Sequence, residues 1–215
     1  IPDNTFYIQV KPEDAHLIVS EHIAKGRKVE KLLYKDLEEL KNVETTDEIK
    51  FYRKQLRIVL RNCGIIDPEN IDEYLARDGY TALGKVLTEY TPEQTIQIIK
   101  DSGLRGRGGA GFPTGLKWEI ARKSPGDEKY VVCNADEGDP GAFMDRSILE
   151  GDPHSVLEAM AICGYCIGAS KGFIYIRAEY PLAIKRLQIA IQQAKEYGLL
   201  GENILGTGFN FDISL

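Results

Sequence analysis

The segment from Asp101 to Gly115 is the part of the sequence best suited to bind an anion. It holds six of the chain's 21 glycines. Glycine lets backbone N–H groups approach a ligand closely and permits a positive φ, which is how loops form concave sites for phosphate. Arg105, Arg107 and Lys117 add positive charge, and a helix that begins at Pro113 would add its N-terminal dipole. We therefore predict an anion or nucleotide cradle, with a flexible connector as the alternative.

The glycines from Gly106 to Gly111 also satisfy the spacing G-x-G-x-x-G. In ordinary dinucleotide-binding folds that pattern follows a strand. Here an amphipathic helix from Pro92 to Ser102 is expected to precede it, which disfavours such a fold. A P-loop is excluded because the chain has no Gly-Lys-Ser or Gly-Lys-Thr triplet.

A second polar loop, from Asn134 to Gly141, directly follows an expected strand. Ligands of parallel sheets bind at the carboxyl ends of strands, so this acidic turn is well placed to line a site. The amide of Asn134 and the carboxylates of Asp136, Glu137 and Asp139 suit the polar edge of a flavin, ribose hydroxyls or a divalent metal. An EF-hand is disfavoured by the spacing. The alternative is a solvated turn.

The cysteines and histidines give no metal site. Cys163 and Cys166 have C-x-x-C spacing, but they lie inside an expected helix without a second pair, so we predict core packing rather than an iron–sulfur or redox site. Cys133 is expected to be a buried strand thiol. The three histidines, at positions 16, 22 and 154, are separated and lack partners.

Composition narrows the class of protein. The formal charge of −6 argues against a nucleic-acid binder. The longest nearly apolar run, Val156 to Ala169, is shorter than the roughly 20 residues that span a bilayer. Four cysteines are too few for a disulfide scaffold and favour a reducing, cytoplasmic setting. The N-terminus, Ile1 to Asn4, has neither an initiator Met nor a signal pattern, which suggests processing or a segment of a longer chain.

The first hundred residues are expected to contain a short strand, a helix, a charged linker and then a mostly helical stretch. A strand is predicted over Thr5–Val10, followed by a helix that ends at Ile23. The charged stretch Lys28–Lys50 has few apolar anchors and is interpreted as a linker or surface arm. Helices are expected between Ile58 and Lys100, the last of them with Thr91 as its N-cap.

From Tyr130 onward the pattern becomes β-α-β-α-β. The expected elements are a strand over Tyr130–Cys133, a helix capped by Asp152–Pro153, a strand over Phe173–Arg177, a helix over Leu182–Tyr197 and a last strand through Phe209, Phe211 and Ile213. This order predicts an α/β fold with a mostly parallel sheet covered by helices.

Two stretches, Ser102–Trp118 and Cys133–Gly141, closely resemble one family. It is the NADH-binding flavoprotein subunit of respiratory complex I, NAD-dependent formate dehydrogenases and multimeric [FeFe]-hydrogenases. The resemblance runs from about Arg53 to Leu215. Glu137–Arg146 is more similar to the hydrogenase and formate dehydrogenase versions than to complex I. Val10–Tyr34 resembles the end of the thioredoxin-like [2Fe–2S] domain that precedes the flavin domain in the beta subunits of electron-bifurcating hydrogenases.

The resemblance implies a Rossmann-like FMN- and NADH-binding domain. Residues 1–34 would end a thioredoxin-like domain, residues 35–57 would be a charged linker, residues 58–100 the helical start of the flavin domain, and residues 101–215 its α/β part. Family members continue with a Gly-rich Glu-Glu segment and a four-cysteine [4Fe–4S] domain, so the chain is expected to be a fragment. Ligands of the iron–sulfur clusters are not expected within it.

The same resemblance implies roles for ten residues. Gly106, Arg107, Gly108 and Lys117 would surround FMN, Gly109 and Phe112 would face NAD, Asn134, Asp136 and Glu137 would contact the flavin ring and ribityl chain, and Asp139 would lie near the NAD ribose. Lys117 and Glu137 would be the catalytic pair.

The implied activity is hydride transfer between the nicotinamide C4 of NAD(H) and the N5 of FMN, with single electrons passed to iron–sulfur clusters. Hydrogenase alpha and gamma-like subunits would be the partners, and a bifurcating hydrogenase the assembly. Formate dehydrogenase and complex I are alternative settings. Two other interpretations remain: a non-catalytic electron-transfer or assembly module, and a simple phosphate-binding domain.

Overall fold

The computed structural model describes residues 3–36 and 41–215, which form two units with a boundary between Arg57 and Ile58. The N-terminal dipeptide Ile1–Pro2 and part of the charged stretch, residues 37–40, lie outside the described residues. Each unit is described by itself.

The first unit begins with an irregular segment and one helix. Helix α1, Asp14–Leu17, continues as the π-helical turn η1, Ile18–Ile23, as the sequence predicted. The predicted strand Thr5–Val10 was wrong. Tyr7 alone makes an isolated bridge, to Leu33, and the positive φ of 51° at Gln9 interrupts the extended backbone.

The charged stretch that follows is folded rather than a bare linker. It contains the 3-10 turn η2, Glu30–Leu32, and an antiparallel pair of strands, β1, Tyr34–Asp36, and β2, Lys41–Val43. Four buried residues supply apolar anchors for this stretch, of which the sequence analysis had counted too few: Val29, Leu32, Leu33 and Val43. The short helices η3, Thr46–Glu48, and α2, Lys50–Arg53, end the unit.

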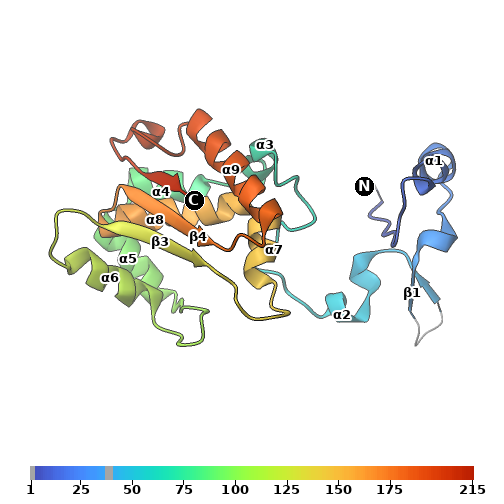
Figure 1. Cartoon of the computed structure of the whole chain (residues 1–215), viewed down its shortest axis with the longest axis horizontal. Helices are drawn as coiled ribbons and strands as arrows, with labels where there is room; N and C mark the ends of the chain where they lie inside the picture. Colours follow the sequence, from blue (N-terminus) through green and yellow to red (C-terminus); the bar gives the residue numbers. More distant parts are fainter. Residues whose placement is uncertain (1–2, 37–40) are drawn as a thin grey trace. The chain divides into compact units, whose positions relative to one another are not determined.

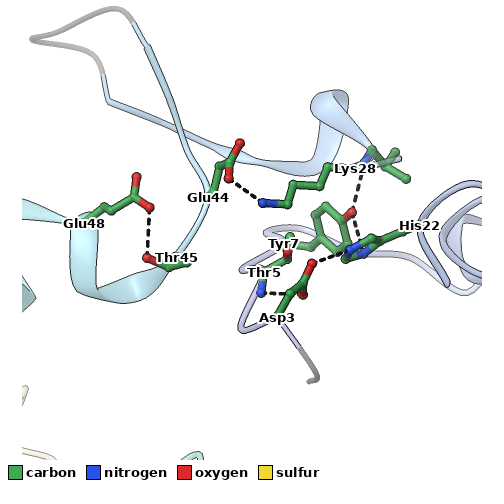
Figure 2. A network of polar contacts seen from close by, with 9 residues as sticks. Asp3, Thr5, Tyr7, His22, Lys28, Glu44, Thr45 and Glu48 are labelled. Carbon is green, nitrogen blue, oxygen red and sulfur yellow. Dashed lines mark hydrogen bonds and ion pairs between the residues drawn. The ribbon is translucent and has the colours of Figure 1, made fainter. Parts of the chain in front are cut away.

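A polar network ties the start of this unit to its helix (Figure 2). The Tyr7 hydroxyl accepts a hydrogen bond from the backbone N–H of Val29 at 2.9 Å and lies 2.9 Å from Nδ1 of His22. Nε2 of His22 lies 2.8 Å from a carboxylate oxygen of Asp3. His22 therefore has polar partners that the sequence analysis did not expect.

The second unit opens with turns and four helices. They are α3, Ile71–Leu75, α4, Thr81–Glu89, α5, Pro92–Asp101, and α6, Thr114–Lys123. The predicted cap of α5 is confirmed: Oγ1 of Thr91 accepts from the backbone N–H of Gln94 at 3.2 Å, and the Gln94 side chain accepts from the backbone N–H of Thr91 at 2.8 Å. Residues 58–66 form turns, so the helical region starts later than expected.

A three-stranded parallel sheet lies at the centre of this unit (Figure 1). Its strands are β3, Tyr130–Ala135, β4, Lys171–Ile176, and β5, Asp212–Ser214, in the order β3-β4-β5. Helices α7, Met144–Gly151, and α8, Pro153–Ile167, connect β3 to β4, and α9, Pro181–Glu196, connects β4 to β5. The predicted α/β fold with a parallel sheet is confirmed, but α7 was not predicted.

Close packing joins α8 to one face of the sheet. A Cβ on Gly164 of α8 would lie 2.5 Å from the ring of Phe211, and a Cβ on Gly172 of β4 would lie 2.9 Å from the same ring. Phe211 is fully buried because both positions are glycine. The sheet residues Val132 and Phe173, which alternate with the buried ones, are exposed on the other face.

A buried carboxylate holds α4 against α8. Glu158 accepts bonds from the hydroxyl of Tyr74 at 2.6 Å and from the backbone N–H groups of Tyr80 and Leu83 at 2.9 and 3.0 Å. It therefore caps α4 from a neighbouring helix. Asp152 does not cap α8 as predicted, because its carboxylate accepts from the Asn62 amide at 2.8 Å and makes no capping bond.

Candidate functional site

The glycine loop connects α5 to α6, and hydrogen bonds join its first residues to its last ones. The backbone N–H of Gly106 donates to the carbonyl of Phe112 at 2.9 Å, and that of Thr114 donates to the carbonyl of Leu104 at 2.9 Å. The Arg105 guanidinium donates to the carbonyl of Gly111 at 2.7 Å. Arg105 therefore braces the loop, rather than facing a ligand as its charge suggested.

The tip of this loop, residues 107–111, leaves its backbone N–H groups without a partner in the described part of the chain. No hydrogen bond within residues 3–36 and 41–215 uses any of them as a donor. Gly109 and Gly111 have positive φ values of 94° and 60°, which explains glycine there. Gly108 has no positive φ, and no atom lies within 4 Å of a Cβ built on it. Its lack of a side chain leaves open space beside these N–H groups.

Gly115 has a different reason to be glycine. A Cβ there would lie 2.6 Å from the backbone nitrogen of Lys100, so this residue allows α6 to pack against α5. The N-cap of α6, Pro113, provides no side-chain hydrogen bond, and the N-terminus of this helix follows the loop directly. The sequence had counted Gly115 with the cradle, but its role is helix packing.

A cavity of about 400 Å³ adjoins the loop. Three predicted site residues line it together: Gly106, Phe112 and Lys117. Its remaining walls are mostly apolar and come from α6, β3 and α8, with Trp118, Ala121, Tyr130, Val131, Val132, Cys163 and Ile167 among them. The volume lies within the roughly 300–1,000 Å³ typical of small-molecule sites. The sequence did not identify Trp118 or Cys163 as part of this site.

The charge of Lys117 reaches into this cavity. Burial raises the pKa of the Cys163 thiol to about 11, although the positive charge of Lys117 opposes the rise. Cys163 is therefore a neutral thiol, and Lys117 is the cation among the cavity's wall residues. Burial likewise raises the pKa of Cys166 to about 12, which agrees with the predicted core packing of the C-x-x-C pair within α8.

The acidic turn begins where β3 ends. The side-chain oxygen of Asn134 accepts from the backbone N–H of Asp136 at 3.0 Å, and the carbonyl of Asp139 accepts from that of Ala142 at 3.1 Å. The side chains of Asp136 and Asp139 are exposed, so both carboxylates are open to a ligand. Asn134 lies two residues beyond Val132, about 7 Å along the strand from the cavity wall.

Glu137 differs from the other acids of the turn because its carboxylate is buried. Its oxygens accept from the backbone N–H groups of Asp145 at 3.1 Å and Arg146 at 3.2 Å, at the start of α7. Burial would raise the pKa of Glu137, but these backbone hydrogen bonds outweigh it and hold the pKa below its usual value. The structure thus places Glu137 as an ionised cap of α7. Its predicted catalytic role stays a prediction.

A smaller cavity of about 160 Å³ lies beside the start of the turn. Cys133, Asn134 and Asp145 line it together with Leu149 of α7. Burial, and then the charge of Glu137, raise the pKa of Asp145. Burial also raises the pKa of Cys133, which is a half-buried strand thiol. Across the described ranges 3–36 and 41–215, no group of three or more His, Cys, Asp or Glu is placed to hold a metal ion.

The cavity beside the glycine loop is therefore lined by the first three residues of β3, Tyr130, Val131 and Val132, whereas the acidic turn follows the carboxyl end of the same strand. Gly106, Phe112 and Lys117 share one cavity, Arg107, Gly108 and Gly109 form the exposed tip beside it, and Asn134, Asp136, Glu137 and Asp139 lie in the turn beyond β3. Within the described residues no hydrogen bond or ion pair joins the two loops directly, so β3 is what sets their spacing.

The chain is similar to known proteins in sequence and in fold. The family model described as the Nuo51 FMN-binding domain, Complex1_51K, matches residues 99–214. The NADP-reducing hydrogenase subunit HndC of Solidesulfovibrio fructosivorans is 69% identical over 163 residues, which are 76% of this chain and 33% of that protein. The F 2 subunit of the NADH-quinone oxidoreductase of Rhizobium meliloti (strain 1021) is 51% identical over 158 residues, 74% of this chain and 38% of that protein.

A solved structure is also similar to this chain. A crystal structure of NAD+-reducing [NiFe]-hydrogenase in the H2-reduced state matches with a TM-score of 0.55 and 30% sequence identity, over 75% of this chain and 25% of that chain. This chain spans about a third of the length of the two sequence relatives.

Proposed function

Since this chain belongs to the Nuo51 FMN-binding domain family, we propose that it forms the flavin- and NAD(H)-binding part of an oxidoreductase subunit. The relatives are named as subunits of a hydrogenase and of NADH-quinone oxidoreductase. The observation that carries the proposal is the cavity shared by Gly106, Phe112 and Lys117.

The residues of this cavity fit FMN. Its mostly apolar walls suit a flat aromatic ring system, and the N–H groups of the loop tip suit a phosphate or the carbonyl edge of the ring. The open space at Gly108 is where a side chain would obstruct such a group. FMN, when bound, supplies a two-electron acceptor that can release its electrons one at a time.

The chain's own residues would bind, orient and stabilise. Lys117 would place positive charge against the reduced, anionic flavin. Phe112, which is 47% exposed at the cavity rim, would pack on the dinucleotide together with Gly109. Arg107 would add charge at the loop tip, and Asn134 and Asp136 would hold polar groups of the flavin. Asp139 would bind ribose hydroxyls of NAD.

The finer setting follows from the resemblance and is part of the proposal. A bifurcating hydrogenase, with alpha and gamma-like partner subunits that carry iron–sulfur clusters, is the assembly we propose, in the cytoplasm. Among the described residues, no helix is long and apolar enough to cross a membrane. The competing function is an assembly module with an empty flavin site.

The visible spectrum of the native protein, before and after anaerobic NADH, separates these functions. A flavin band at about 450 nm that bleaches with NADH would support hydride transfer, because only a correctly oriented flavin accepts hydride. A native protein that holds no flavin even after FMN is added would favour the assembly module. If NADH leaves the flavin band unchanged, the protein binds flavin but NADH is not its reductant.

A further inference from the structure

An arginine that the sequence did not single out holds the acidic turn from the next strand. Arg177 directly follows β4, whose carboxyl end lies beside that of β3. Its guanidinium donates to the main-chain carbonyl of Glu137 at 2.5 Å. The two strands are thereby joined one step beyond the sheet, where their own hydrogen bonds have ended.

The guanidinium of Arg177 is itself fixed by its neighbours. It lies 5.3 Å from the ring centre of Tyr180 and pairs with the carboxylate of Glu179 at 3.2 Å. The nearby Asp136 contributes to the raised pKa of Arg177, after the Glu179 hydrogen bond and charge. Arg177 therefore stays charged beside the start of the turn.

The other end of the turn is fixed by the side chain of the same glutamate. The carboxylate of Glu137 accepts the first N–H groups of α7 and lies 3.4 Å from the hydroxyl of Tyr180, which is buried. The guanidinium of Arg146, in the first turn of α7, lies 5.5 Å from the same Tyr180 ring. Glu137 is thus held through its carbonyl by Arg177 and through its carboxylate by α7.

We propose that Arg177 is a positioning residue for cofactor binding: it fixes the backbone at Glu137 so that the acidic turn keeps its place beyond the carboxyl end of β3. The inference rests on the proposed function, because it gives the turn a ligand to face. Arg177 acts on the main chain of the turn, so its effect does not require contact with FMN or NADH.

The test compares Arg177→Gln and Arg177→Lys in the native protein. A matched control exists in Arg186→Gln, because the Arg186 guanidinium also donates to a main-chain carbonyl at 2.5 Å, that of Glu150 at the far end of α7. Hydrogen exchange of residues 136–146 measures the turn in the FMN-free protein, and a titration with FMN measures binding.

We expect Arg177→Gln to speed exchange of the turn and to weaken FMN binding, each by roughly tenfold, the equivalent of one lost hydrogen bond to a charged group. Arg177→Lys, which retains the charge, should lie between wild type and Arg177→Gln. Arg186→Gln should leave both quantities within about twofold of wild type, because the acidic turn does not depend on that bond.

Unchanged exchange in Arg177→Gln, or equal effects of Arg177→Gln and Arg186→Gln, would overturn the positioning role while leaving the flavin function intact. Faster exchange with unchanged FMN affinity would overturn it too, because the turn would be looser without consequence for the cofactor. If the wild-type protein binds no FMN, the proposed function fails and the role in cofactor binding fails with it, which the wild-type titration shows before any variant is compared.

Discussion

Lys117 and Glu137 are oppositely charged residues near β3, and their different surroundings indicate different roles. Lys117 lines a cavity with mostly apolar walls, so its charge is available to a ligand. Glu137 is buried against α7, and the backbone N–H groups of that helix already occupy its oxygens. The family resemblance implied a catalytic pair, whereas the contacts make Lys117 the residue with the more direct effect on a bound cofactor.

Lys117→Ala should weaken FMN retention and lower NADH oxidation, because it removes the positive charge that would stabilise reduced flavin. Loss of one such interaction lowers affinity or turnover by about ten- to a hundredfold. The measurement is flavin content per chain together with steady-state NADH oxidation. Lys123→Ala is the matched control: it lies on the same helix, and its ammonium pairs with Glu119 instead.

Wild-type flavin content and turnover in Lys117→Ala would refute the assignment. Equal losses in Lys117→Ala and Lys123→Ala would point to a defect of α6 as a whole, and would also contradict a direct role for Lys117.

At the scale of elements, glycines have two different roles: some leave space for a ligand, and others lie within packed elements. Gly108→Ala should not lower the free energy of unfolding, since no protein atom lies within 4 Å of the new Cβ, but it should weaken FMN binding by obstructing the loop tip. Gly84→Ala lies inside α4, where the new Cβ would meet Leu205 at an ordinary 3.6 Å. It should stabilise the protein by about 0.5–1 kcal/mol and leave FMN binding unchanged.

Chemical denaturation and FMN titration of the two variants check these outcomes. The space at Gly108 would have no ligand role if Gly108→Ala bound FMN as tightly as wild type. Destabilisation by Gly84→Ala would show that α4 is strained around Leu205.

The elements that the sequence predicted well are those with local signals. Thr91, Pro92 and Gln94 mark the start of α5 by hydrogen bonds within four residues, and the alternation of β3 and β4 follows from burial of one sheet face. Helix α7 was missed because its cap is Glu137, which approaches from across a turn rich in Asp, Gly and Pro. The same holds for Arg177, whose role depends on the pairing of β4 with β3.

The small core of the first unit was also missed by the sequence analysis. Charged residues between positions 28 and 50 suggested a linker, yet Val29, Leu33 and Val43 are buried there. Few apolar residues suffice when a pair of short strands brings them together, and that pairing is not visible in composition.

At the scale of the whole second unit, the scaffold behind the site is held by a buried polar cluster. Glu158 of α8 accepts a hydrogen bond from Tyr74 of α3 and one from the backbone of Tyr80 at the start of α4. Nδ1 of His154, also on α8, lies 3.0 Å from the Tyr80 hydroxyl, and its Nε2 lies 3.3 Å from the Gln193 side chain of α9. These contacts connect four helices on the side of the sheet away from the exposed face. Loss of these contacts should therefore lower the free energy of unfolding of the whole second unit.

This cluster predicts that stability falls as the pH drops. Burial lowers the pKa of His154 to about 4 from 6.5, so between these values the unfolded chain binds a proton that the folded chain does not. Unfolding is therefore favoured as pH falls through this range, by about 2 kcal/mol between roughly pH 7 and pH 5. Asp152 opposes part of this loss, since burial raises its pKa.

Denaturation followed by fluorescence isolates the effect, because Trp118, the chain's one tryptophan, lies in the second unit. His154→Gln removes the titrating group while retaining an amide that can bond to Tyr80. This variant should lower the free energy of unfolding at neutral pH, and that free energy should then depend less on pH between pH 7 and pH 5. The reduced pH dependence distinguishes proton binding by His154 from its contribution to packing. If wild type and His154→Gln lose the same free energy over this interval, the acid sensitivity comes from the carboxylates, and His154 serves packing alone.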